Sequence, residues 1–142
     1  MARRLLLLEP LQGGKDLALL ALRLVAGGFL VWEMWPNVSD PAHMQAVIGY
    51  FGDNGFAYPE FFGPLSAWAQ LLIGAALILG LLTRWAGIFL TFNFVVGVWM
   101  VHWGQTYREQ WPALALIVFG LIFATIGAGR WAVDSLWERK PA

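Results

Sequence analysis

Four apolar stretches, each of about 20 residues, constrain the fold of this 142-residue chain more than any other feature of its sequence. They cover residues 17–35, 64–82, 85–103 and 111–128. A helix of roughly 20 residues crosses about 30 Å of hydrocarbon. Lipid offers no partners for the free amides of an open sheet edge, so each stretch is expected to be helical. The sequence therefore predicts an all-α fold: one membrane domain over residues 1–142, built as a four-helix transmembrane bundle.

The composition supports a membrane protein and excludes several other classes. Charged residues make up 13% of the chain and hydrophobic residues 59%, whereas a soluble domain carries about 25% charged residues. The net charge is zero and no basic patch stands out, so no nucleic-acid partner is expected. Without cysteine, the chain has no disulfide framework, thiolate metal site or Cys-X-X-Cys redox pair. Residues 1–14 are interpreted as an interfacial cytoplasmic segment, not a removed leader, because Glu9 and Pro10 end a short apolar run.

The basic residues predict the orientation of the bundle. Of nine Lys and Arg residues, Arg23 lies inside a span, Arg108 on one side, and seven on the other: Arg3, Arg4, Lys15, Arg84, Arg130, Arg139 and Lys140. Segments rich in Lys and Arg remain in the cytoplasm. Both termini are therefore expected there, in a bacterial inner membrane. Tryptophans form two expected interfacial belts, with Trp32, Trp35, Trp68, Trp99, Trp103 and Trp111 outside and Trp85, Trp131 and Trp137 inside.

The outward connection over residues 37–63 is long and rich in aromatic residues. Asp40 before Pro41 is typical of a helix start, so a short amphipathic helix is expected over residues 41–51. Asp53, Asn54 and Gly55 are expected to form a turn. This loop is predicted to lie on the membrane interface and cover the outer mouth of the bundle.

Small residues are spaced to bring the helices close together. Ala76 and Gly80 lie four apart on the second helix, and Gly120, Ala124 and Ala128 form a ridge of small residues on the fourth. Gly27 and Gly28 make the first helix narrow at one point. In lipid, helix association depends on such close packing. The same ridges can pair the chain with a second copy or with a partner membrane or periplasmic protein.

Three polar side chains are predicted to share one depth near the outer surface. Glu33, Gln70 and His102 come from three different helices, and Trp32, Trp68 and Trp99 lie beside them. An acid, an amide and an imidazole between aromatic walls suit a quinone headgroup, whose carbonyls need donors and whose reduction needs protons. The alternative is that Glu33 and His102 are hydrated among lipid headgroups while Gln70 bonds a neighbouring helix.

Other polar residues have structural interpretations that compete with functional ones. Arg23, at membrane depth in the first helix, is expected to reach the cytoplasmic interface or to bond carbonyls at the end of the fourth helix. Asn93 is expected to bond a neighbouring helix. Arg130 and Asp134, four apart, would form an ion pair if helical, or would cap the bundle at the loop of Arg84. No haem or metal is expected, because the two histidines show no ligand spacing.

The order of several motifs resembles the DoxX-like family of small four-helix bacterial membrane proteins. The first helix carries Leu22-Arg23-Leu24, then Gly27, Gly28 and Phe29; the outward loop ends in the sequence GFAYPE at residues 55–60; the second helix closes with GLLTR at 80–84; and GAGRWAVD follows at 127–134. The resemblance covers residues 17–137. Gln70 stands where members often carry Glu, and Trp35-Pro36-Asn37 where they carry a basic residue.

This resemblance implies a redox-associated membrane protein. The family includes a subunit of a thiosulfate:quinone oxidoreductase, and other members are linked to sulfur metabolism and oxidative stress. It implies contact with quinone but no particular substrate, and leaves open whether the chain itself is an enzyme. Two alternatives remain: a non-enzymatic scaffold or accessory subunit of a membrane complex, and a small transporter or lipid-binding protein.

Overall fold

The computed structural model describes residues 13–138, and all regular elements within them are helices. In chain order they are α2 (Lys15–Ser39), α3 (Pro41–Asp53), α4 (Pro59–Leu79), α5 (Thr83–Gly97), the π-helical η2 (Val98–His102), α6 (Tyr107–Ile126) and α7 (Asp134–Glu138). Four segments are long and apolar enough to cross a membrane: α2, α4, α5 continued by η2, and α6. The predicted all-α, four-helix fold is confirmed. Most of the predicted interfacial segment lies outside the described residues.

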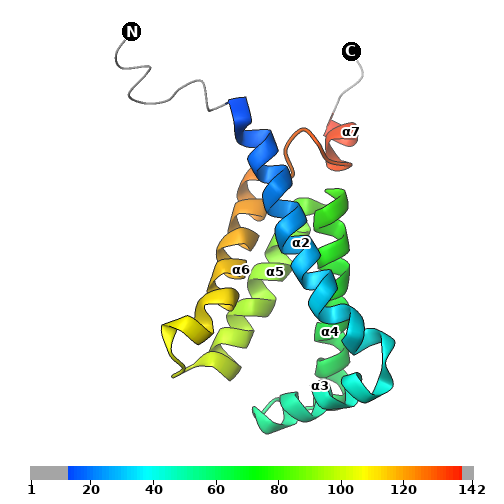
Figure 1. Cartoon of the computed structure of the whole chain (residues 1–142), viewed down its shortest axis with the longest axis vertical. Helices are drawn as coiled ribbons and strands as arrows, with labels where there is room; N and C mark the ends of the chain where they lie inside the picture. Colours follow the sequence, from blue (N-terminus) through cyan, green and yellow to red (C-terminus); the bar gives the residue numbers. More distant parts are fainter. Residues whose placement is uncertain (1–12, 139–142) are drawn as a thin grey trace.

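The four long helices are arranged as two pairs. α2 packs along α4 and α5 packs along α6, whereas contacts between the two pairs are much less extensive. Figure 1 shows the start of α2 and the short α7 at one end of the bundle, here named the terminal end. From there the pairs diverge toward the distal end, where α3 crosses beneath α2 and α4 (Figure 1). The two ends of the molecule are therefore built differently.

Each pair crosses at two facing glycines. A Cβ on Gly27 would stand 2.6 Å from the carbonyl oxygen of Gly74, and a Cβ on Gly87 would stand 2.5 Å from that of Gly120. Such backbone-to-backbone approach is the usual basis of helix packing in lipid. Gly27 and Gly120 therefore pack as expected from their spacing. Gly28, by contrast, faces open space.

The core that joins the two pairs lies toward the terminal end. It contains Ala26 and Leu30 of α2, Ile73 and Leu77 of α4, Ala86 and Leu90 of α5, and Leu116 and Phe123 of α6. Leu30, Leu77, Leu90 and Phe123 are fully buried. In α4 and α5 the core residues belong to the halves that meet at their short connection. The distal halves of these helices carry polar residues instead, and the cavity described below lies among them.

The helices extend beyond several predicted span boundaries. α2 continues through Pro36 to Ser39, and α4 begins at Pro59 with Pro64 inside it. Proline is tolerated within membrane helices because neighbouring groups satisfy the freed carbonyls. At their other ends α4 and α6 stop at Leu79 and Ile126, before the predicted 82 and 128. Gly80 follows α4 in the left-handed conformation at φ 68°, and Gly127 follows α6 at φ 89° and ψ −159°, so a backbone with positive φ ends both helices.

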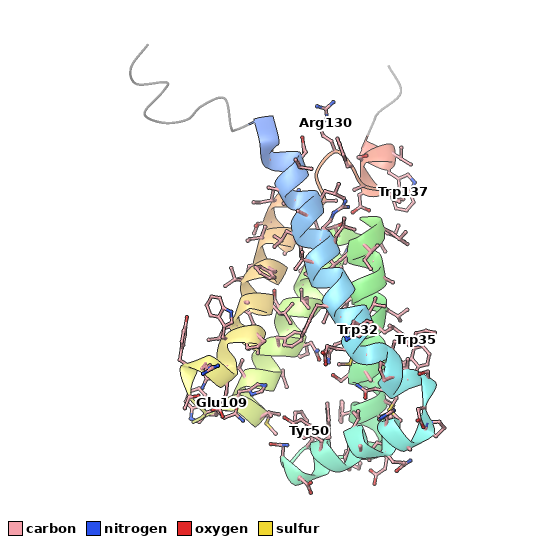
Figure 2. The ribbon with its side chains drawn as sticks, viewed as in Figure 1. Trp32, Trp35, Tyr50, Glu109, Arg130 and Trp137 are labelled. Carbon is pink, nitrogen blue, oxygen red and sulfur yellow. The ribbon has the colours of Figure 1, made fainter. Side chains whose placement is uncertain are left out.

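Every one of the nine tryptophans points outward. Their side chains are 49–80% exposed, far more than tryptophan in a soluble domain. Figure 2 shows Trp137 at the terminal end, whereas Trp32 and Trp35 lie on the distal half of α2. Exposed aromatic side chains over a bundle of apolar helices form a surface suited to lipid and its headgroups.

Candidate ligand cavity and the polar networks at both ends

A cavity of about 380 Å³ lies between α2, α3 and α4 in the distal half. Its lining residues are Met34 and Asn37 of α2, His43, Ala46, Val47, Tyr50 and Phe51 of α3, and Ser66, Ala67 and Gln70 of α4. The side chains of His43 and Tyr50 are exposed, whereas Ala67 is buried. The cavity thus joins an apolar wall to a few polar groups, the usual composition of a small-molecule site.

Local sequence signals place α3 across the distal end. Asp40 caps the helix by accepting a hydrogen bond from the Ala42 amide at 2.8 Å, as the Asp-Pro pair predicts. Gly63 of α4 packs against Ile48 of α3, because a Cβ there would stand 3.4 Å from the Ile48 Cα, at van der Waals contact. The predicted turn follows, with Gly55 at φ 79° and the Phe51 and Phe56 rings 4.5 Å apart. α3 is thereby fixed against α4 and forms one wall of the cavity.

A chain of three polar side chains connects the cavity to the second helix pair. Gln70 Nε2 donates to Ser66 Oγ at 3.0 Å, and Ser66 Oγ donates to Asn93 Oδ1 of α5 at 3.1 Å. Gln70 and Ser66 line the cavity, whereas Asn93 does not. The expectation that Asn93 bonds a neighbouring helix is confirmed. Ser66 drew no attention in the sequence, although it lies four residues before Gln70 and hence on the same helix face.

Two further polar groups face the cavity from α2 and α3. Asn37 Nδ2 donates to the carbonyl of Glu33 at 3.2 Å and contacts Met34 Sδ at 3.8 Å. His43 Nδ1 lies 3.4 Å from Asp40 Oδ2, one helical turn earlier. Both side chains of this His–Asp pair are more than half exposed, so the pair orients the imidazole more than it stabilises the fold.

Of the six residues expected to form an outward pocket, only Gln70 lines the cavity. Glu33, Trp32, Trp68 and Trp99 are exposed. His102 lies in η2, where its Nδ1 is 2.6 Å from Gln105 Oε1 and its carbonyl accepts from Gln110 Nε2. α2 turns Met34 and Asn37 toward the cavity in place of Glu33. The structure therefore does not bring Glu33, Gln70 and His102 together.

At the terminal end, Arg23 is fully buried and does not reach the interface. Its Nη2 donates to the carbonyl of Trp131, in the segment after α6, whereas Nε and Nη1 have no partner within residues 13–138. Trp131 lies after α6, which ends at Ile126, so the expected bonds from Arg23 to carbonyls at the end of the fourth helix do not form. The other expectation, an arginine extended into the interface, is also wrong, because the segment around Trp131 folds over the side chain.

Asp134 and Arg130 do not form the ion pair expected of a helix, because regular helix begins only at Asp134. The Asp134 carboxylate accepts from the amides of Leu82 at 2.7 Å and Thr83 at 2.8 Å, capping the start of α5. The Arg130 amide donates to Asp16 Oδ1 at 3.0 Å. The alternative, a cap at the loop of Arg84, is the arrangement observed for Asp134.

Arg84 caps the other helix of its pair. Its Nη1 donates to the carbonyls of Ala124 at 3.1 Å and Thr125 at 2.7 Å, and its Nη2 to that of Ile126 at 3.5 Å. These are carbonyls that the end of α6 leaves free, and a cation there also complements the helix dipole. This is the contact that was expected of Arg23. It belongs to Arg84 because α5 lies alongside α6.

In the part of the chain that the structure describes, no group of three His, Asp or Glu side chains is placed to hold a metal ion. The polar atoms available to a ligand are those of the cavity. They can accept or donate hydrogen bonds to a small polar head whose apolar part lies on Val47, Phe51 and Met34.

Four apolar helices and outward tryptophans define a multi-pass integral membrane protein. The model of the DoxX family matches residues 18–103, more than half of the chain, which therefore belongs to that family. The match covers α2 to η2 and so includes every residue that lines the cavity. Comparison with curated proteins and with solved structures gives no match.

Proposed function

We propose that this chain binds a quinone in the cavity between α2, α3 and α4 and serves as a subunit of a membrane redox system. The observation that carries the proposal is a ring-sized cavity with an apolar wall and polar atoms of Asn37, His43 and Gln70 at its edge. A quinone ring needs such an apolar surface, and its two oxygens need hydrogen-bonding partners.

The lining residues fit that chemistry. Met34, Val47 and Phe51 offer soft apolar contacts to a ring, and Met adapts readily to flat aromatic surfaces. Gln70 and Asn37 are fixed by their own hydrogen bonds, so they hold a ligand oxygen at little cost in entropy. The exposed tryptophans around the bundle indicate that lipid surrounds it, and a quinone would arrive from that lipid.

A bound quinone carries two electrons and two protons between redox partners. The chain would contribute binding, orientation and a proton acceptor. With a hydrogen on Nδ1 facing Asp40, His43 has a lone pair on Nε2 that can take a proton from a ligand hydroxyl. Residues 1–142 contain no cysteine, so we propose that electrons come from a substrate or partner protein outside this chain.

The cellular setting is part of the same proposal. Lys15, Arg84 and Arg130 are exposed at the terminal end and Arg108 at the distal one. The positive-inside rule then supports cytoplasmic termini in a bacterial inner membrane. The cavity would lie in the outer half of the membrane. A periplasmic or membrane partner, or a second copy of the chain, would complete the complex.

The test is photoaffinity labelling of the full chain in lipid nanodiscs with an azido-ubiquinone of short tail. We expect labelled peptides from residues 34–51 and 66–70, displaced by excess unmodified quinone. Gln70→Leu should weaken labelling at least fivefold, and His102→Ala, a distal histidine outside the cavity, should leave it unchanged. Labelling spread evenly over the lipid-facing surface and not displaced by quinone would refute the proposal and favour a scaffold or a lipid-binding protein.

A further inference from the structure

The hydrogen bonds around the cavity use most of the N–H and O–H donors of its polar lining residues and leave their acceptor atoms free for a ligand. Asn37 directs its amide nitrogen at the Glu33 carbonyl and the Met34 sulfur, so both of its N–H groups are used. Its Oδ1 accepts no hydrogen bond from residues 13–138. On this side, therefore, Asn37 offers the cavity a lone pair and no hydrogen.

Gln70 is oriented in the same sense by a residue that does not line the cavity. Asn93 Oδ1 can only accept, so it takes the hydrogen of Ser66, and the Ser66 oxygen must then accept from Gln70 Nε2. This order fixes the orientation of the Gln70 amide, with Nε2 toward Ser66 and Oε1 away from it. Oε1 and a single N–H of Gln70 remain for a ligand, and the Ser66 hydroxyl has no hydrogen left to offer.

His43 completes the pattern on α3. The Asp40 carboxylate, 3.4 Å from Nδ1, favours the tautomer with its hydrogen on that nitrogen. The neutral ring then presents the Nε2 lone pair. Tyr50 is the one lining residue whose hydroxyl can either donate a hydrogen bond to a ligand or accept one from it.

We infer that the cavity binds the hydroquinone form of its ligand more tightly than the quinone form; this inference depends on the proposed function. A hydroquinone presents two O–H donors, which match the three acceptors Asn37 Oδ1, Gln70 Oε1 and His43 Nε2. A quinone presents two carbonyl oxygens, for which the lining leaves as donors one N–H of Gln70 and the Tyr50 hydroxyl, and it cannot satisfy the lone pairs of Asn37 and His43. Asn37 and Gln70 are partly buried, where an unpaired polar atom costs binding free energy, so the order of Asn93, Ser66 and Gln70, which orients Gln70, contributes to the redox preference.

The experiment compares duroquinone with durohydroquinone, kept reduced under anaerobic conditions, by calorimetric titration of the full chain in nanodiscs. We expect the hydroquinone to bind at least tenfold more tightly. Preferential binding of the reduced form raises the midpoint potential of the bound couple, and a tenfold preference for a two-electron couple corresponds to about 30 mV.

Two variants test the role of the hydrogen-bond order. Asn93→Leu frees the Ser66 hydroxyl to donate, and Ser66→Ala frees the Gln70 amide to turn; each should lower the affinity ratio below that of the wild type while total binding persists. Thr125→Val removes a different membrane-depth hydroxyl, bonded within α6, and should keep the wild-type ratio. Thermal unfolding of each variant separates a change in ratio from a loss of fold, which would lower both affinities together.

The outcomes are distinguishable. Equal affinity for both forms, or tighter binding of duroquinone, overturns the inference but leaves the proposed function standing. Binding of neither form contradicts the proposed function itself. A hydroquinone preference that neither Asn93→Leu nor Ser66→Ala lowers refutes the assigned role of the Asn93, Ser66 and Gln70 order.

Discussion

The guanidinium of Arg23 lies against Gly80, in the space that a side chain at position 80 would occupy. Arg23 is buried and bonded to the Trp131 carbonyl, and Gly80 accepts a backbone hydrogen bond from Asp134 at 2.9 Å. Three segments distant in sequence thus meet at one point: the first helix, the connection between α4 and α5, and the chain after α6.

Gly80→Ala is expected to destabilise the protein severely. A Cβ there would clash with Arg23 and would stand 2.5 Å from the Ala132 Cβ, and its backbone has φ 68°. The left-handed backbone alone costs about 1–2 kcal/mol for alanine, and overpacking adds about 1–3 kcal/mol. Gly55→Ala, also at positive φ but with no atom within 4 Å, should show only the first cost. Thermal unfolding in detergent measures both; equal losses would show that the Arg23 contact is unimportant.

Gly87→Ala should push α5 and α6 apart where the two helices cross. A Cβ at this position would stand 2.5 Å from the Gly120 carbonyl oxygen and 2.6 Å from the Ala124 amide nitrogen, and a backbone cannot yield as a side chain does. We expect a loss of about 1–3 kcal/mol. Gly97→Ala, on the same helix and facing open space, should be neutral or stabilising by up to about 1 kcal/mol. Unfolding midpoints in one detergent check the pair, and a stable Gly87→Ala variant would contradict the crossing.

Asp134→Ala should loosen the terminal end. It leaves the amides of Leu82 and Thr83 without their acceptor, and Leu82 has a left-handed backbone at φ 49° that this bond helps to hold. A loss of about 1–3 kcal/mol is expected, with a smaller loss for Asp134→Asn, which keeps one acceptor oxygen. Hydrogen exchange should also become faster at Val133 and Asp134, whose amides bond Leu79 and Gly80. Asp53→Ala, an exposed carboxylate at the end of α3, is the control and should change neither readout.

Single cysteines can test the proposed orientation cleanly, because the chain has none of its own. Gly13→Cys and Asp53→Cys place exposed thiols at the terminal and distal ends. A membrane-impermeant maleimide should label Asp53→Cys in intact cells and Gly13→Cys only after permeabilisation. The reverse pattern would invert the orientation, and labelling of both in intact cells would argue that α2 does not cross the membrane.

Much of the fold follows from local sequence signals. Hydropathy locates the four long helices, since each must satisfy its own backbone in lipid. Asp40 and Pro41 locate the start of α3, because capping depends on neighbouring residues alone. The interior positions of Pro36 and Pro64 could not be predicted in the same way. Whether a proline ends a membrane helix depends on tertiary surroundings that satisfy the freed carbonyls.

The cavity depends on how the helices are rotated, which hydropathy does not report. Once Gly27 is known as the crossing point on α2, helical spacing places Met34 and Asn37, seven and ten residues later, toward α4, and turns Glu33 away. Without that contact, Glu33 is the more conspicuous residue. The ion pair of Arg130 and Asp134, which depended on a helix there, does not form, since residues 127–133 are not helical and Gly127 and Gly129 have positive φ, whereas the alternative cap by Asp134 does form.

The uneven placement of the core has a mechanical consequence. The helix pairs are packed together toward the terminal end only. A rotation of about 5° at the core therefore displaces atoms about 15 Å away by roughly 1 Å. Ser66 lines the cavity and also donates a hydrogen bond to Asn93 of α5, in the other helix pair. A change in the separation of the two helix pairs at the distal end would therefore alter the shape of the cavity through the bond between Ser66 and Asn93.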